Sequence, residues 1–229
     1  MKILKKRYWF LPILIFMIGC EPEKEEPGIL NSVYFPLEIG NFWIYEVDES
    51  IYYGENDFET NQYFYRDEIT DQYVNEENDP VFLFKRQSSP DRNNWKNEQV
   101  FAYTFSRNRL IRTHDNLQEI VLVYPIGGDL EWDGNGLNNK FSENFFIENL
   151  GSYALKDRAY PHTVSVRQSD EDDRITIRDI RYDVYAINVG LIESYYEVYH
   201  YCSRNDCLGE QIIQNGRFTH LKLLSNGKL

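Results

Sequence analysis

The two C-terminal cysteines are the residues whose spacing most directly suggests chemistry. Cys202 and Cys207 are separated by four residues and flanked by segments of β-type composition. A four-residue hairpin loop would place their Cα atoms about 4.5–5.5 Å apart, which is within disulfide range. With His200 they could instead be three soft ligands for zinc or copper, but a fourth ligand is not evident, although His220 lies on a neighbouring segment. We predict a disulfide and no cofactor.

Two acidic segments could bind calcium, and one of them could also hydrolyse a glycoside. The segment Asp129-Leu130-Glu131-Trp132-Asp133-Gly134 begins like a calcium loop, but its twelfth position is Lys140, where a bidentate Glu is needed. The same acids could serve as the acid/base pair of a glycosidase. The run from Asp170 to Asp173 is typical of a solvated turn between strands. We therefore expect polar turns at both places.

The sequence carries no further catalytic pattern. The four histidines are scattered, and neither HExxH, GxSxG, CxxC nor a phosphate-binding glycine loop occurs. We predict no catalytic residue.

Tyrosine is abundant, with 18 residues and a cluster between positions 195 and 201. In an extended strand Tyr195, Tyr199 and Tyr201 would share one face, while Tyr196 would lie on the other. Such rings can form cross-strand ladders, or they can offer a flat apolar face and a polar tip to a sugar or another ligand. The candidate ligand-binding residues are Trp43, Trp132, Tyr195, Tyr199 and Tyr201.

The N-terminus has the form of a secretory leader. A basic head, Lys2 to Arg7, precedes an apolar run of 11 residues from Tyr8 to Ile18, and about 20 apolar residues are needed for a helix to span a bilayer. The end, Met17-Ile18-Gly19-Cys20, resembles the lipobox of bacterial lipoproteins, although Met17 replaces the usual Leu. The resemblance implies that residues 1–19 are a signal peptide and that acylated Cys20 anchors the chain in a membrane. The alternative is a plain leader in which Cys20 is incidental.

Residues 20–30 form an acidic, proline-containing tether that cannot fold alone. Lys24-Glu25-Glu26 resembles the export signal of surface-exposed lipoproteins of Bacteroidota, and a generic solvated tether is the alternative. We expect an outer-membrane lipoprotein facing either the periplasm or the cell surface.

The charge of the chain excludes one class of partner. Without the leader, 20 basic residues face 37 acidic ones, a net charge of −17. Such a polyanion is repelled by phosphate backbones, so nucleic acid is not expected as a partner. We take the protein to be a monomer.

The composition of the body predicts strands. From Asn31 onward only four alanines occur, while β-branched and aromatic residues recur with period two. The predicted strands, ordered along the chain, are Phe42–Tyr53, Val81–Lys85, Val100–Phe105, Ile120–Tyr124, Thr163–Arg167, Ile175–Ile180, Tyr182–Ile187, Ile192–Cys202 and Arg217–Leu224.

Two segments refine this prediction. Asn215-Gly216, flanked by apolar runs, predicts a type I′ hairpin turn because both residues tolerate positive φ. Asn138 to Leu150 could form either one short helix or a strand. We predict an all-β domain over residues 31–229, a curved antiparallel sheet, open barrel or sandwich with at most one or two short helices.

An internal echo suggests a duplicated half-domain. Phe35-Pro36-Leu37 is followed by Trp43, and Tyr124-Pro125-Ile126 is followed by Trp132, each Trp seven residues after the Pro. The echo predicts either two related halves, 34–122 and 123–229, or two convergent strand-entry turns.

These segments resemble a group of uncharacterised Bacteroidota lipoproteins. The group shares an aromatic-Pro-Leu, a Gly and a Trp-x-Tyr, which correspond to the segment from Tyr34 to Tyr45. Trp132-Asp133-Gly134-Asn135 and the segment from Val184 to Ile192 are similar to two further blocks. The resemblance implies a secreted, acylated β-domain and no particular activity.

Three functions are compatible with these features. We prefer a non-enzymatic envelope lipoprotein whose β-domain binds a glycan, a peptide or a partner protein. A lipid or lipoprotein carrier would need a dry cavity of at least about 300 Å³. A glycoside hydrolase would need two of the acids near Trp132 to converge in a cleft.

Overall fold

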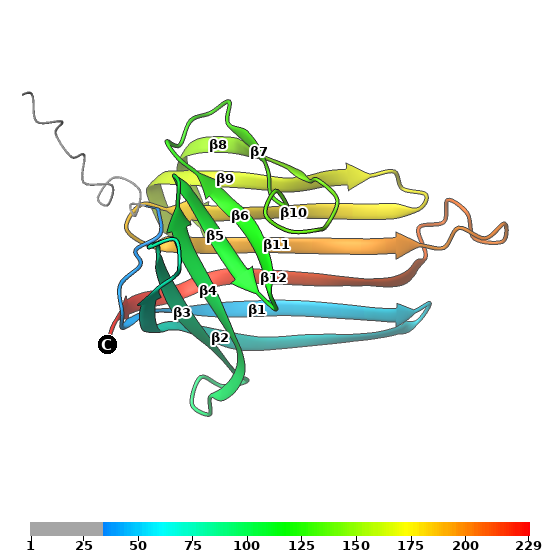
Figure 1. Cartoon of the computed structure of the whole chain (residues 1–229). Helices are drawn as coiled ribbons and strands as arrows, with labels where there is room; N and C mark the ends of the chain where they lie inside the picture. Colours follow the sequence, from blue (N-terminus) through cyan, green and yellow to red (C-terminus); the bar gives the residue numbers. More distant parts are fainter. Residues whose placement is uncertain (1–33) are drawn as a thin grey trace, which may run out of the picture.

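The computed structural model describes residues 34–229 (Figure 1). The predicted signal peptide, Cys20 and the tether of residues 20–30 lie outside the described residues. Among residues 34–229 no helix has the length and apolarity needed to cross a membrane.

The alternating aromatic and β-branched residues form twelve antiparallel strands, and the described part of the chain contains no helix. The all-β prediction is therefore confirmed. The strands are β1 (Asn41–Gly54), β2 (Asp57–Val74), β3 (Pro80–Ser89), β4 (Lys96–Ser106), β5 (Arg109–His114), β6 (Leu117–Val123), β7 (Glu131–Asp133), β8 (Asn144–Leu155), β9 (Arg158–Asp172), β10 (Ile177–Ala186), β11 (Gly190–Tyr201) and β12 (Ile213–Lys228).

All twelve strands belong to one sheet, in the order β6-β5-β4-β3-β2-β1-β12-β11-β10-β9-β8-β7. Each strand pairs with its neighbour in sequence, and only β1–β12 joins distant parts of the chain. The edge strands β6 and β7 also meet, because Ile120 N donates to Gly134 O at 2.9 Å and Trp132 Nε1 donates to Ile120 O at 2.7 Å. The sheet is thus a nearly closed barrel.

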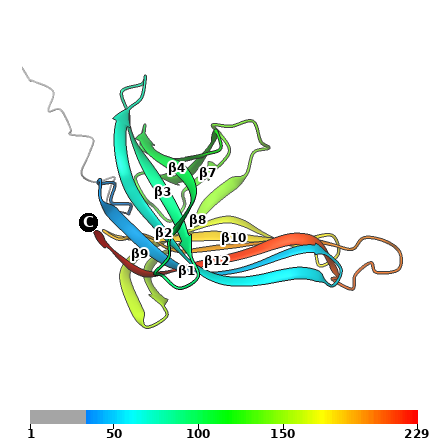
Figure 2. The same ribbon diagram turned by 90° about the horizontal axis from the view of Figure 1, so that it is seen from below.

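The barrel is closed at one end only (Figures 1 and 2). Strands β3–β6 cross over β9–β12, and we call this two-layered part the closed half. The hairpins β1–β2, β9–β10 and β11–β12 continue beyond it as a single layer. We call residues 48–62, 168–179 and 197–217 of these hairpins the distal sheet.

The core lies between the two layers of the closed half. Phe35, Trp43 and Phe84 are buried in one aromatic cluster, with the Phe35 and Phe84 ring centroids each 5.8 Å from that of Trp43. Trp43 Nε1 donates to Val189 O at 2.5 Å. Gly190 makes this approach feasible, since a Cβ there would lie 3.2 Å from Trp43 Nε1 and its φ is +97°.

The predicted turn at Asn215-Gly216 is wrong. Both residues lie within β12, where Asn215 pairs with His200 and Gly216 with Tyr199. A Cβ at Gly216 would lie 2.3 Å from the Val198 carbonyl oxygen and 2.8 Å from Cα and Cδ1 of Tyr199, and its φ is +153°. The glycine therefore allows the close approach of β11 rather than a turn, and the chain reverses in the loop of residues 202–212.

The structure also decides the predictions for two other segments. Of the two alternatives for Asn138 to Leu150, the strand forms over residues 144–150, as the first part of β8, while residues 138–143 belong to the preceding loop. Ile175–Ile180 and Tyr182–Ile187, predicted separately, contribute to the single strand β10. The proposed duplication stays a prediction, although β1–β6 and β7–β12 divide the sheet into two six-stranded runs at the expected boundary.

Candidate functional site

An interior cavity of about 230 Å³ lies in the closed half, between the two layers of the sheet. One part of its wall is apolar and consists of core rings, including Trp43, Phe84 and Phe101. The remaining wall is polar and consists of Asp67, Arg86, Gln99, Tyr103, Arg112, His114, Ser194, Tyr196 and Thr219. The cavity therefore combines ring faces with hydrogen-bonding groups.

Asp67 and Arg86 form a paired wall of this cavity. Arg86 Nε and Nη2 donate to Asp67 Oδ1 and Oδ2 at 2.7 and 2.6 Å, and the two residues are cross-strand partners on β2 and β3. The guanidinium also lies over the rings of Tyr65 and Phe101, at 4.4 and 5.2 Å. The charges of Asp67 and Arg86 neutralise each other, and the two rings cover the guanidinium. This pair therefore shapes the cavity without offering a free charge to a ligand.

Arg112 makes fewer hydrogen bonds within the protein than Arg86 does. Its Nη2 donates to Glu119 Oε2 at 2.5 Å, across the β5–β6 pair. Its side chain remains 39% exposed, and within residues 34–229 its other guanidinium N–H groups have no hydrogen-bond acceptor. Arg112 thus presents spare donors at the cavity wall.

Asp183 stands behind the same wall, on the inward face of β10. It accepts hydrogen bonds on Oδ2 from Gln168 Nε2 at 3.0 Å and from Tyr185 Oη at 3.1 Å. Burial raises the pKa of Asp183 above the usual range for an aspartate, while the positive charge of Arg112 opposes the shift. A buried carboxylate with a raised pKa beside a cavity is a mark of functional sites.

Tyr103 and Tyr45 complete the polar wall in different ways. Tyr45 Oη donates to Leu191 O at 3.1 Å and is therefore satisfied. The Tyr103 hydroxyl has no hydrogen-bond partner among the described residues, and burial raises the pKa of Tyr103 to about 12. It stays protonated at neutral pH and is a further spare donor.

A second polar cluster lies on the outer face of the same strands. Glu193 is 5% exposed and accepts hydrogen bonds from Tyr153 Oη at 2.5 Å, Tyr182 Oη at 3.3 Å and His220 Nε2 at 2.6 Å. Burial alone would raise the pKa of Glu193, but the hydrogen bonds from His220 and Tyr153 outweigh it, and the pKa is lowered.

The outer cluster is covered by the β8–β9 hairpin, which curls beneath the sheet in Figure 2. Lys156 at its tip pairs with Glu46 on β1, and Tyr153 of the hairpin binds Glu193 on β11. Every polar atom of Glu193 is thus engaged within the protein, so this cluster is a clamp for the hairpin rather than an open site.

The structure separates the candidate ligand-binding residues. Trp43 lines the interior cavity. Trp132 closes the seam between β6 and β7 through its bond to Ile120 O. The rings of Tyr195 and Tyr199 belong to the outer face, where Tyr195 stacks on Tyr182 and Tyr199 meets Tyr52, and Tyr201 is 7% exposed. No single platform contains all five.

Sequence reasoning missed the polar residues of the cavity. Asp67, Arg112 and Asp183 each occupy inward positions of strands. The available signal was a charged residue in phase with the apolar positions of an alternating strand, as Asp67 is with Tyr65 and Ile69.

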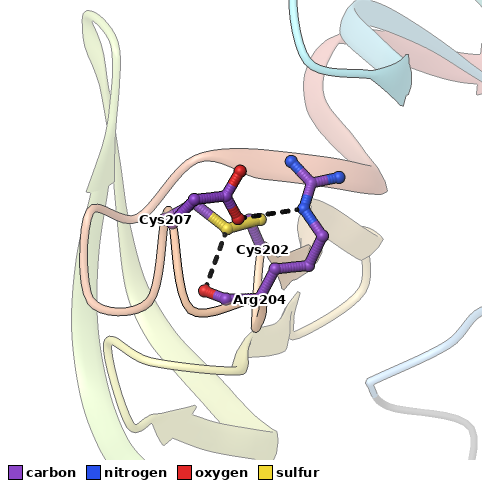
Figure 3. Close-up of a disulfide and its surroundings, with 4 residues drawn as sticks. Cys202, Arg204 and Cys207 are labelled. Carbon is purple, nitrogen blue, oxygen red and sulfur yellow. Dashed lines mark hydrogen bonds and ion pairs between the residues drawn. A yellow bond between two sulfur atoms is a disulfide. The ribbon is translucent and has the colours of Figure 1, made fainter.

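The disulfide forms between Cys202 and Cys207, whose Cα atoms are 5.8 Å apart (Figure 3). It does not join facing strands: β11 ends at Tyr201, and Cys207 lies within the loop, with its amide bonded to Arg204 O at 3.1 Å. His200 does not join them, since within residues 34–229 the only group close enough for a metal is Cys202, Asp206 and Cys207. Both sulfurs of that group are in the disulfide.

The carboxylates of the two acidic segments stabilise the turns in which they lie. Asp133 Oδ1 accepts the amides of Asn135 and Glu143 at 2.9 and 3.1 Å, while Glu131 and Asp129 are exposed. Asp173 accepts the Thr176 hydroxyl on Oδ2 and the amides of residues 175–177 on Oδ1, and these bonds, the hydroxyl first, lower its pKa. The carboxylates near Trp132 do not converge in a cleft, and the geometry gives the hydrolase hypothesis no support.

No known family model matches the chain, and no curated protein matches it. Two solved structures are similar in outline. One is a Bacteroides fragilis protein assigned as exported and described as having a YmcC-like fold, with 12% identity, a TM-score of 0.42 and coverage of 86% of this chain and 99% of that one. The other is a protein from Parabacteroides distasonis assigned as a lipoprotein, with 10% identity, a TM-score of 0.38 and coverage of 84% and 98%.

Proposed function

We propose that this protein is a non-enzymatic envelope lipoprotein, anchored by acylated Cys20, whose interior cavity binds a saccharide unit. The anchor rests on the leader, since its apolar run of 11 residues ends in Gly19-Cys20 and is too short to stay as a membrane span. The tether of residues 20–30 supports it, because a polar segment of that length separates a folded domain from a bilayer.

The observation that carries the binding function is the mixed lining of the cavity. Aromatic faces such as Phe101 lie beside hydrogen-bonding groups such as Tyr103, Gln99 and Arg112. A sugar ring has this same composition, with apolar C–H faces and a polar rim. Tyr196, whose side chain borders the cavity and is 40% exposed, adds a ring that solvent can reach.

The same cavity does not suit a lipid carrier. Its volume of about 230 Å³ is below the smallest typical ligand pocket of about 300 Å³. Asp67, Arg86 and Arg112 in its wall would each have to be desolvated by an acyl chain. The size suits one ring of a saccharide rather than a long chain.

Saturation-transfer NMR on the full-length protein in detergent micelles tests the binding function. Neutral, N-acetylated and acidic hexoses are the probes. We expect transfer to at least one of them, and we expect it to fall at least threefold in Tyr103→Phe and to be unchanged in Tyr199→Phe, whose ring lies on the outer face. A Kd of about 10 mM is the weakest binding that the proposal allows. If no sugar shows transfer at concentrations of about that order, the proposal is wrong.

Metabolic labelling with an alkyne fatty acid tests the anchor separately. We expect the wild-type protein to incorporate the label and Cys20→Ala to incorporate none. An intact N-terminus without an acyl adduct in mass spectrometry would overturn the lipoprotein assignment. Protease accessibility in whole cells then distinguishes the cell surface from the periplasmic face.

A further inference from the structure

The cavity wall places two hydrogen-bond donors with spare capacity side by side, since Arg112 and Tyr103 are cross-strand partners on β5 and β4. Gln99, Ser194 and Thr219 of the same wall can both donate and accept. The wall carboxylate of Asp67 already accepts two bonds from Arg86, and the Leu191 carbonyl already accepts the Tyr45 hydroxyl. The Tyr103 hydroxyl and most N–H groups of Arg112 have no acceptor among residues 34–229. A ligand that places an acceptor beside Arg112 and Tyr103 satisfies both of these donors.

The charges around the cavity are balanced in pairs. Arg86 is neutralised by Asp67, and Arg112 by Glu119, while Asp183 stands behind the wall at 4% exposure. An anionic ligand would meet the Asp67 and Glu119 carboxylates, and a cationic ligand would meet the two guanidinium groups. The wall therefore favours a neutral ligand that presents an acceptor to Arg112 and Tyr103.

The apolar side of the cavity narrows the choice of ligand further. Trp43, Phe84, Leu191 and Leu221 line it, and none of these side chains can satisfy a sugar hydroxyl. A plain hexose would direct hydroxyl groups, which are donors as well as acceptors, against this surface. An acetamido group brings a carbonyl oxygen for the Arg112 and Tyr103 donors, an N–H that Gln99 or Thr219 can accept, and a methyl group for the apolar wall.

We propose that the sugar recognised by this cavity is N-acetylated, with its acetamido carbonyl bound by Arg112 and Tyr103 and its methyl group against the apolar wall. This inference rests on the proposed saccharide-binding function and specifies its ligand class. Tyr196, at the solvent-accessible border of the cavity, would contact the face of the sugar ring.

Titration of the full-length protein with four monosaccharides tests this ligand class. The probes are N-acetylglucosamine, glucose, glucosamine and glucuronic acid, followed by saturation-transfer NMR and calorimetry. We expect N-acetylglucosamine to bind at least tenfold more tightly than each of the others, with the strongest transfer at its acetyl methyl. Tyr103→Phe removes only a hydroxyl with no protein partner, so it should fold normally and weaken binding three- to tenfold.

Each outcome has a defined meaning. Equal or tighter binding of glucose, glucosamine or glucuronic acid overturns the N-acetyl assignment but leaves saccharide binding in place. Absence of binding by all four sugars, and by the other hexoses tested above, overturns the proposed function itself. N-acetylglycine amide is the control for an acetylated peptide, and if it binds as tightly as N-acetylglucosamine, the sugar assignment is wrong.

Discussion

The closed half and the distal sheet are built from the same strands but are stabilised by different interactions. In the closed half two layers bury Trp43, Phe84 and their neighbours against each other. The distal sheet is a single layer with 13 acidic and four basic residues, and its contacts are cross-strand pairs such as Tyr52–Phe58, whose ring centroids are 5.4 Å apart. Burial therefore supports one half, and pairing across strands supports the other.

The ion pairs of the two regions also differ in how far they are removed from water. The ion pair Asp67–Arg86 is buried between the layers, whereas Arg178 of the distal sheet binds Asp172 and Glu197 with its side chain 34% exposed. A pair that is removed from water is costly to break, while an exposed pair contributes little. Matched substitutions in the two regions can test this contrast directly.

The largest effect is expected from a core ring. Phe84 is 1% exposed and Phe58 is 57% exposed. Phe84→Ala leaves a cavity between the layers and should lower the free energy of unfolding by about 4 kcal/mol. Phe58→Ala, the matched distal variant, should lower it by less than about 1 kcal/mol. Urea denaturation measures both, and equal losses would contradict the division into two regions.

The next effect is expected from the buried ion pair. Arg86→Met leaves the Asp67 carboxylate uncompensated and should cost about 3 kcal/mol. Arg178→Met removes an exposed pair in the distal sheet and should cost less than about 1 kcal/mol. The comparison is made by denaturation at low and at high salt. A loss for Arg86→Met that matches the distal variant would show that the pair is solvated after all.

A smaller and more local effect is expected from the disulfide. Replacing Cys202 and Cys207 by Ser releases a short loop, and the chain-entropy relation gives about 2 kcal/mol for such a loop. Because the loop protrudes from the distal sheet, we expect faster proteolysis within residues 203–211 and unchanged amide exchange in β3–β6. Faster exchange in β3–β6 would mean that the two regions unfold together.

The smallest effect is expected from Glu193, and it depends on pH. The pKa of Glu193 is lowered from 4.5 in the folded protein, so its contribution is present above pH 4.5 and is lost as the pH falls through the folded pKa. Glu193→Gln should lower stability by about 1 kcal/mol at pH 7. The difference from the wild type should vanish in acid, as denaturation at several pH values can show. A difference that does not change with pH would exclude a role for the charge.

The sequence predicts strands with a long apolar or alternating run better than strands without one. Strands whose inward side is apolar, such as Val81–Lys85 and Val100–Phe105, were expected and lie within β3 and β4. Strand β2 was not expected, because residues 57–62 are polar apart from Phe58, are exposed on both faces and carry no alternation. Pairing with β1 across the short turn at residues 55–56 forms this strand, and the composition of residues 57–62 does not reveal that pairing.

The candidate site shows the same difference between what a local pattern predicts and what depends on the fold. The disulfide follows from a spacing and was expected, whereas the cavity depends on which layer lies opposite which. Asp67 on β2, Arg112 on β5 and Asp183 on β10 come together only because the sheet folds over itself. The Asn215-Gly216 dipeptide failed as a turn signal because its glycine instead allows the close approach of Val198 and Tyr199 on the paired strand β11, which register fixes.

The strand order has a consequence for engineering the chain. Leu229 N donates to Gly40 O at 2.9 Å, so the last residue lies beside the entry to β1. A short peptide could therefore join Leu229 to the segment that precedes β1 and places Phe35 in the core, and a new opening could be made at Gly127-Gly128, where an added Cβ meets no atom within 4 Å. The permuted chain would start at β7 and end at β6, and its strands would follow the sheet from one edge to the other without a break.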